Sequence, residues 1–234
     1  MSADLRIEAV DAIDIHVEQY DWPFARARAR DIDAHWRKLR AARPHLFNGR
    51  VFLFRNLQIA EAHLTGSCFE VDFKVFIAAR DFGHPDKTVF NCFAQGALRA
   101  LDGAFLLGEM AAHTSNAGRI YFPAGTPDTS DAVDGRVDLD LSVMRELTEE
   151  TGLRPDDIAP APGWTVVLDH QMVACLKPMR LKLDRAAALA QIAAHISSEE
   201  HPELARIHVA SSRGDIVAAR MPLFIQAYLN RELA

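Results

Sequence analysis

The chain has 234 residues, of which 49% are apolar and 25% charged, and its formal net charge is −6. This size and apolar content suit one large domain, or one domain with a substantial extension, around a packed core. The negative charge argues against nonspecific nucleic-acid binding, which depends on neutralising phosphates. No apolar run reaches the roughly 18 residues of a membrane span, and the N-terminus lacks the basic start and apolar stretch of a signal peptide. We therefore expect a cytoplasmic protein without membrane attachment.

The N-terminal third predicts a strand followed by a basic helix. Residues 7–20 alternate in part between apolar and polar side chains, which favours a strand. Residues 26–42 place Ile32, Trp36 and Leu39 at near-helical spacing, which favours a helix with one apolar face.

Two further alternating runs complete this part of the chain. Residues 50–57 and 67–79 both alternate apolar and polar side chains, so we predict two strands. A turn at His84-Pro85-Asp86 follows. We place a domain boundary after it, with a β-rich α+β extension at residues 1–88 and the main domain at residues 89–234.

The main domain predicts strands interspersed with helices. Residues 90–107 suggest two strands around a Leu101-Asp102-Gly103-Ala104 turn, because Asp-Gly between apolar runs is a hairpin signal. Further strands are expected at residues 119–122, 164–168, 172–176 and 207–210, and helices at residues 185–196 and 222–233. This mixture indicates an α/β or α+β layered fold.

The most specific stretch is Arg145-Glu146-Leu147-Thr148-Glu149-Glu150-Thr151-Gly152-Leu153. On a helix, its three glutamates fall within an arc of roughly 100°. Like charges at this spacing destabilise a bare helix, and a hard divalent cation such as Mg²⁺, which takes oxygen ligands, would offset the repulsion. The alternative interpretation is a solvated acidic face with an Arg145–Glu149 ion pair. An apolar Val143–Leu147 pair that would anchor the helix argues for the positioned, cation-binding interpretation.

This stretch resembles the second half of the Nudix box, G-x5-E-x7-R-E-U-x-E-E-x-G-U, in which U is a bulky aliphatic residue. All seven specified positions of that half are present. The resemblance extends from about residue 90 to the C-terminus.

The first half of the box departs from the pattern. Counting back from Arg145, the motif's glycine falls on Asp131 and its glutamate on Val137. The Tyr121–Pro127 segment resembles the turn that opens the box, but its Gly125 lies twenty positions before Arg145, where the family has fourteen. The loop is thus six residues longer. One of its acids is expected to replace the missing glutamate, and the sequence leaves the choice open among Asp128, Asp131, Asp134 and Asp138.

The resemblance implies a fold, a cofactor and an activity. The implied fold is a Nudix-type α/β/α sandwich with a mixed sheet, here with an N-terminal β-rich extension. The implied catalytic residues are Arg145, Glu146, Glu149 and Glu150. The three glutamates would bind Mg²⁺ or Mn²⁺, and Arg145 would orient them. The implied reaction is pyrophosphate cleavage in a nucleoside diphosphate linked to another moiety, such as a nucleotide-sugar, a dinucleotide or a coenzyme A-like substrate. The implied partner is therefore a small-molecule nucleotide, and a homodimer is expected.

Several points remain open at the level of sequence. The general base is either a glutamate of the box or an acid from a late loop, where Glu199 and Glu200 are candidates. The altered first half of the box motivates an alternative function, a Nudix-fold module that binds a nucleotide without cleaving it. A third alternative is an isomerase of the same fold that employs a cysteine, but Cys92 lacks a matching histidine-rich metal site. Substrate-binding residues are not assigned.

Overall fold

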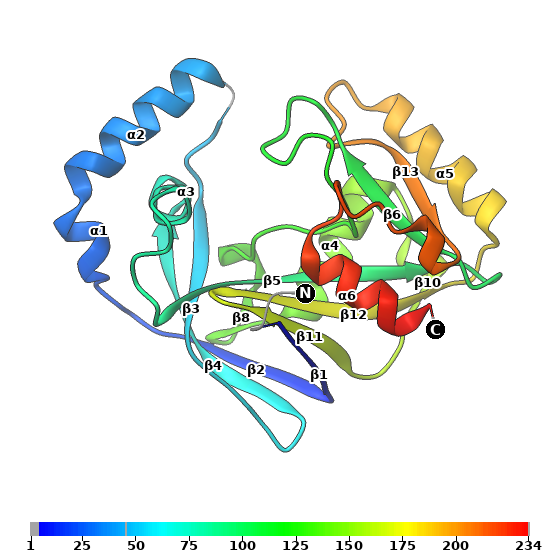
Figure 1. Cartoon of the computed structure of the whole chain (residues 1–234), viewed down its shortest axis with the longest axis horizontal. Helices are drawn as coiled ribbons and strands as arrows, with labels where there is room; N and C mark the ends of the chain where they lie inside the picture. The colour runs from blue at the N-terminus through cyan, green and yellow to red at the C-terminus, as the bar shows by residue number, and fades with distance from the viewer. Residues whose placement is uncertain (1–4, 45, 234) are drawn as a thin grey trace.

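A mixed β-sheet forms the centre of the structure, a computed structural model that describes residues 5–44 and 46–233. Thirteen strands join this sheet in the described part of the chain (Figure 1). They include every strand predicted after residue 88. The strands are β1 (Arg6–Val10), β2 (Ala12–Val17), β3 (Arg50–Ala60), β4 (His63–Asp72), β5 (Val89–Arg99), β6 (Phe105–Met110), β7 (Ile120–Tyr121), β8 (Ala132–Val133), β9 (Arg136–Val137), β10 (Ile158–Pro160), β11 (Trp164–Asp169), β12 (Met172–Leu181) and β13 (Leu204–Ala210).

Strand β5 links the two halves of the sheet. Along the main path the strand order is β1-β11-β12-β5-β3-β4-β2-β9-β8. β5 runs parallel to β12 over nine residue pairs, whereas it meets β3 only at Phe54↔Phe90 and Arg55↔Val89. The N-terminal strand β1 pairs antiparallel with β11 and so lies at the edge of the C-terminal half. The extension and the main domain therefore share one sheet, and the boundary at residue 88 stays a prediction.

Helices cover both faces of the sheet, as expected for an α/β/α sandwich. They are α1 (Pro23–Ala27), α2 (Ala29–Ala42), α3 (Phe73–Asp81), α4 (Leu139–Thr151), α5 (Arg185–Ser198) and α6 (Leu223–Glu232). Among the described residues, no helix is both long and apolar enough to cross a membrane.

The alternation of side chains along β5 shows which helix covers which face. Cys92 and Ala94 belong to the core cluster that contains Val143 and Leu147 of α4. Phe93, which alternates with them, packs with the cluster that contains Phe224 of α6. Successive side chains of a strand point to opposite faces, so α4 and α6 lie on opposite sides of the sheet. Both faces of the central strands are buried, which explains their near-continuous apolar sequence.

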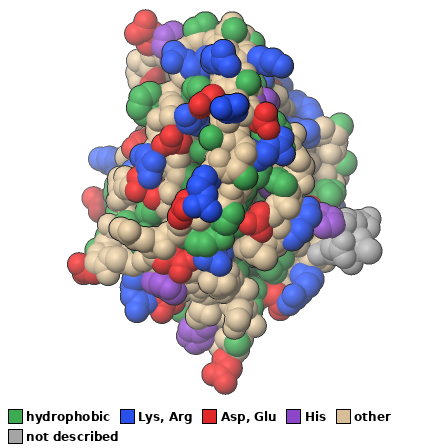
Figure 2. Space-filling view, turned by 90° about the vertical axis from the view of Figure 1, so that its left-hand side faces the viewer, with side chains coloured by type: hydrophobic (Ala, Val, Ile, Leu, Met, Phe, Trp, Pro, Cys, Tyr) green, Lys and Arg blue, Asp and Glu red, His purple; other side chains and the backbone are tan. Residues whose placement is uncertain are grey.

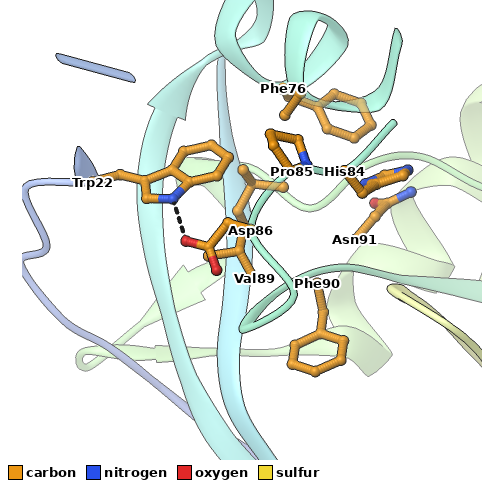
Figure 3. A pocket seen from close by; sticks show the side chains of 10 residues that line it. Trp22, Phe76, His84, Pro85, Asp86, Val89, Phe90 and Asn91 are labelled. Carbon is orange, nitrogen blue, oxygen red and sulfur yellow. Dashed lines mark hydrogen bonds between the residues drawn. The ribbon is translucent and has the colours of Figure 1, made fainter. Parts of the chain in front are cut away.

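The N-terminal extension has a separate small core. Trp22 packs there with Phe69 and Phe76, and its indole Nε1 donates a hydrogen bond of 2.8 Å to Asp86 Oδ2 (Figure 3). This bond joins the start of α1 to the turn predicted at His84–Asp86. Burial, together with the nearby positive charge of Lys87 and Arg80, lowers the pKa of His84 below its usual range. The turn is therefore a packed structural element that orients the start of β5.

The predicted strand at residues 67–79 is correct only up to Asp72. Residues from Phe73 to Asp81 form α3 instead, with Phe76 and Ile77 buried on its inner side. A distant residue stabilises the start of this helix, because the side-chain oxygen of Asn48 accepts a hydrogen bond of 2.9 Å from the backbone N–H of Lys74. The alternating pattern was wrong here because a tertiary contact supplies a helix start that the local sequence does not contain.

Charged side chains are spread over the outer face of the N-terminal extension. Figure 2 shows Lys and Arg mixed with Asp and Glu on this side of the molecule. Several of the basic side chains are ion-paired, including Arg28 with Asp31 and Lys74 with Asp33. Exposed pairs of this kind contribute little to stability, and their mixed signs are typical of a solvated surface.

Asn48→Ala is expected to destabilise the protein by about 1 kcal/mol, the usual cost of removing an acceptor from a helix N-terminus. Urea denaturation measures this change. Asn48→Asp keeps the acceptor and should retain most of the stability. Equal unfolding midpoints for Asn48→Ala and the unmodified chain would contradict the proposed stabilisation of α3.

Candidate active site

Helix α4 carries the acidic residues, and its own sequence fixes both ends. The Asp138 side chain accepts a hydrogen bond of 2.9 Å from the N–H of Leu141 at the N-terminus. Gly152 ends the helix with φ 63°, a left-handed conformation that favours glycine. Val143 and Leu147 are buried against β5. The helix and its apolar anchor are as the sequence predicts, and its acidic side faces the loop formed by residues 123–131.

Two glutamates contact the backbone of loop 123–131. Glu150 Oε1 accepts a hydrogen bond of 3.1 Å from the Ala124 N–H. Glu146 lies so close to Gly125 that a Cβ at that position would overlap its carboxylate. The glycine is therefore required for a close approach between this backbone and the acids.

A buried ion pair fixes loop 123–131 on helix α4. Asp131 is 0% exposed, and its carboxylate accepts hydrogen bonds from Arg145 Nε (3.2 Å) and Nη2 (3.0 and 3.1 Å). Its Oδ2 also accepts a bond of 3.0 Å from the Asp128 N–H. Burial opposes the charge of Arg145, but its hydrogen bonds to Asp131 and the neighbouring glutamates hold its pKa above the usual range. The guanidinium therefore stays charged.

Four aspartates are open from the sequence as replacements for the motif's glutamate. Among them, Asp131 is the one whose carboxylate contacts Arg145 in the described part of the chain. A signal was nevertheless present, because Gly125 and Asp131 keep the G-x5-E spacing of the motif. The six extra residues come after Asp131, and the β8–β9 hairpin at residues 132–137 accounts for them.

Arg145 also pairs with two of the glutamates. Its Nη1 lies 2.7 Å from Glu146 Oε1 and 3.3 Å from Glu149 Oε2. The Glu149 side chain is 59% exposed, whereas Glu150 is only 7% exposed. The structure therefore brings Glu146 and Glu150 together at loop 123–131 and leaves Glu149 at the solvent side of the same arginine.

Burial raises the pKa of Glu146 to about 7, against the attraction of Arg145 and with the repulsion of Glu149 and Glu203. Burial also raises the pKa of Glu150 well above its usual range, with added repulsion from Glu146. The protein thus compensates the negative charge of Glu146 and Glu150 only in part. Such perturbed groups concentrate at functional sites.

The sequence analysis missed Glu203, which lies just before β13. Its charge acts on both Glu146 and Glu150 and raises their pKa values. Glu199, one of the two late-loop acids proposed from sequence, lies 3.4 Å from His195 Nε2. Three glutamates occur within five residues of this loop, and sequence alone does not show which one faces the acidic helix.

Two features of the carboxylates at this site bear on whether a divalent cation fits there. Among the described residues, no three His, Cys, Asp or Glu side chains form a ready-made metal-binding group. Glu150 Oε2, however, is buried and has no hydrogen-bond partner. Buried carboxylate oxygens without a partner are costly, and an all-oxygen donor set suits Mg²⁺ or Mn²⁺. Glu146 and Glu150 therefore fit a hard cation, and Glu149 and Glu203 lie near enough to add negative charge.

A cleft of about 590 Å³ begins at this site. Ala124, Gly125 and Thr126 line one end of it, next to Glu146 and Glu150. Cys92 lies outside this cleft and is fully buried, with its sulfur 3.8 Å from that of Cys175. The cysteine-dependent isomerase therefore finds no support.

No family model matches the chain, and no curated protein matches it. Several solved structures are similar to it. A Nudix hydrolase from M. smegmatis, RenU, shares 13% identity at a TM-score of 0.36, covering 60% of this chain and 80% of that one. A MutT protein from Methanosarcina mazei Go1 shares 18% identity at a TM-score of 0.40, covering 61% and 92%. A mutant form of the Bacillus subtilis pyrophosphohydrolase BsRppH shares 14% identity at a TM-score of 0.36, covering 60% and 77%.

Asp131→Asn is expected to destabilise the fold by about 3 kcal/mol, because it removes the charge that compensates a partly buried arginine. The estimate lies at the lower end for buried pairs, since the Arg145 side chain is 26% exposed. Thermal unfolding measures the change. Asp134→Asn, in the exposed turn of the β8–β9 hairpin, is the matched control and should leave the midpoint nearly unchanged. A similar small effect for both variants would contradict the role given to Asp131.

Proposed function

We propose that this chain is a divalent-metal-dependent hydrolase that cleaves the pyrophosphate linkage of a nucleoside diphosphate derivative. The observation that carries the proposal is the pair Glu146 and Glu150, held against the backbone of loop 123–131 with Glu150 Oε2 buried and unpaired. The resemblance of residues 145–153 to the Nudix box supports it independently, because the motif assigns metal binding to the same helix face.

In this proposal, Glu146, Glu149 and Glu150 would hold Mg²⁺ or Mn²⁺. When bound there, the cation would lower the pKa of a water and neutralise charge on the phosphate oxygens. The protein supplies position. Asp131 fixes the Arg145 guanidinium, and Arg145 in turn orients Glu146 and Glu149. Glu203, with a carboxylate near the acid pair, is a candidate to accept a proton from the attacking water, beside the earlier candidates Glu199 and Glu200.

Glu150→Gln is expected to lower kcat by more than about 100-fold. Loss of a group that only supports a metal ligand costs up to about 100-fold, and Glu150 is itself a proposed ligand. The glutamine still accepts the Ala124 N–H, so the fold should persist. Turnover is measured by chromatography as formation of the nucleotide product from nucleotide-sugars, dinucleotides and acyl-coenzyme A with saturating Mg²⁺. Glu8→Gln, on the edge strand β1, is the control and should retain full activity. Unchanged turnover in Glu150→Gln would refute the assignment.

Mg²⁺ or Mn²⁺ is also expected to raise the unfolding temperature, because ligands that bind only the folded state stabilise it. The rise should be absent in Glu150→Gln, and a chelator should reverse it in the unmodified chain. Differential scanning fluorimetry measures it. A metal-induced rise of the same size in Glu150→Gln would place the cation elsewhere.

A second function is favoured by one observation. Arg145 pairs with both Glu146 and Glu149, so these two carboxylates already have a positive partner without a metal ion. This arrangement suits a module that binds a nucleotide without cleaving it. Calorimetric binding of a nucleotide substrate, with no cleavage to a nucleoside monophosphate under saturating Mg²⁺ or Mn²⁺, would support this sensor function in place of the hydrolase.

A further inference from the structure

The cleft beside the acidic site extends from Gly125 to Arg80 of α3. Its walls come from three segments far apart in sequence: helix α3, the loop after β6 and the start of α6 (Figure 1). A second open space of about 670 Å³ adjoins it, and both spaces are lined by Arg80, Asn116 and Arg119. A ligand whose diphosphate lies at Gly125 can therefore extend past α3 into this second space.

The floor of the cleft holds a buried carboxamide that lacks a partner. Gln95 on β5 is 1% exposed, and its Oε1 has no hydrogen-bond partner. Asn91, four residues earlier on the same face of the strand, also lines the cleft, and its Oδ1 is likewise unpaired. Buried polar atoms are nearly always paired, so these two carboxamides point to a ligand with hydrogen-bonding groups along a planar edge.

Aromatic side chains flank the same floor. Phe93, between the two carboxamides, meets Phe224 of α6 edge-to-face with ring centroids 5.3 Å apart. Phe73 and Phe76 line the opposite wall, from α3. An aromatic ring would gain contact area here, and glutamine or asparagine carboxamides pair in two-bond fashion with the amino edge of adenine.

The far end of the cleft is cationic. Arg43, Arg80 and Arg119 line the adjoining space, and no Asp or Glu of the described chain lines it with them. The Nε–H of Arg80 donates a hydrogen bond of 2.9 Å to Asp81 Oδ1, which leaves the two terminal guanidinium nitrogens available to a ligand. Arginines suit phosphate because the guanidinium presents paired N–H groups.

We propose that this cleft binds the part of the substrate beyond its diphosphate, and that this part carries an amino-purine ring and a further phosphate. Gln95 pairs with the ring, and Arg80 and Arg119 bind the additional phosphate. The N-terminal extension is then part of the substrate site, since α3 supplies Arg80 and one aromatic wall. This inference rests on the proposed hydrolase function for the place of the diphosphate, but it concerns separate residues.

The test uses ligands that have no pyrophosphate bond, so it is independent of hydrolysis. Adenosine 3′,5′-bisphosphate and adenosine 5′-monophosphate are titrated calorimetrically into the full chain with chelator present. The bisphosphate is expected to bind at least about tenfold more tightly, because it adds charge-assisted hydrogen bonds. Arg80→Met should remove most of this difference, with Arg119 left to contact the additional phosphate, and leave the affinity for the monophosphate unchanged. Arg30→Met, on the exposed side of α2, is the matched control and should keep the difference.

Gln95→Leu tests the ring-binding part and should weaken both ligands about tenfold, the usual effect of losing a hydrogen bond to a ligand. Its unfolding temperature is measured alongside, because Gln95 is buried, and Arg80→Met tests the proposal if that variant fails to fold. Equal affinity of the unmodified chain for the two ligands, binding of neither, or an Arg80→Met variant that keeps the preference would overturn the proposal. Selective binding without any hydrolysis of diphosphate substrates would uphold it and refute the proposed activity instead.

Discussion

The buried Asp131–Arg145 pair is the interaction on which the rest of the site depends. It joins loop 123–131, which carries Ala124 and Gly125, to the helix that carries the glutamates. Without this connection the loop backbone would lose its fixed place against Glu146 and Glu150. A buried charge is stable only when it is paired and hydrogen-bonded, and Asp131 meets both conditions through Arg145 and the Asp128 N–H. The pair therefore defines one arrangement of loop and helix.

The same arrangement concentrates negative charge that the protein neutralises only in part. Arg145 is shared among Asp131, Glu146 and Glu149, so Glu150, the most buried of the three glutamates on α4, receives only the Ala124 N–H. Glu203 adds repulsion. A site built for stability alone would not bury Glu150 with an unpaired oxygen. Such a local cost is typical of functional sites, where the surrounding structure holds groups ready for a ligand.

The sequence predicted the acidic helix well because its determinants are local. Asp138, the Val143–Leu147 pair and Gly152 each act within one or two turns of α4. The features that sequence analysis missed are all nonlocal. Helix α3 begins where Asn48 reaches Lys74 from another segment, and Glu203 reaches the acids from a loop some fifty residues beyond them. Asp131 was one of the four candidate aspartates. Selecting it requires either the contact with Arg145 or a comparison with the motif that takes the inserted β8–β9 hairpin into account. The cleft could not be foreseen, since its walls come from segments whose proximity only the fold creates.

The most direct test of the account is the position of a metal ion. A crystal of this chain grown with Mn²⁺ allows the ion to be found by its anomalous scattering. The account predicts a peak bounded by Glu146 and Glu150 beside the backbone of Ala124 and Gly125, with the Asp131–Arg145 pair intact. Mn²⁺ bound only at other positions, or Glu146 and Glu150 remaining in their protein contacts at saturating Mn²⁺, would contradict it.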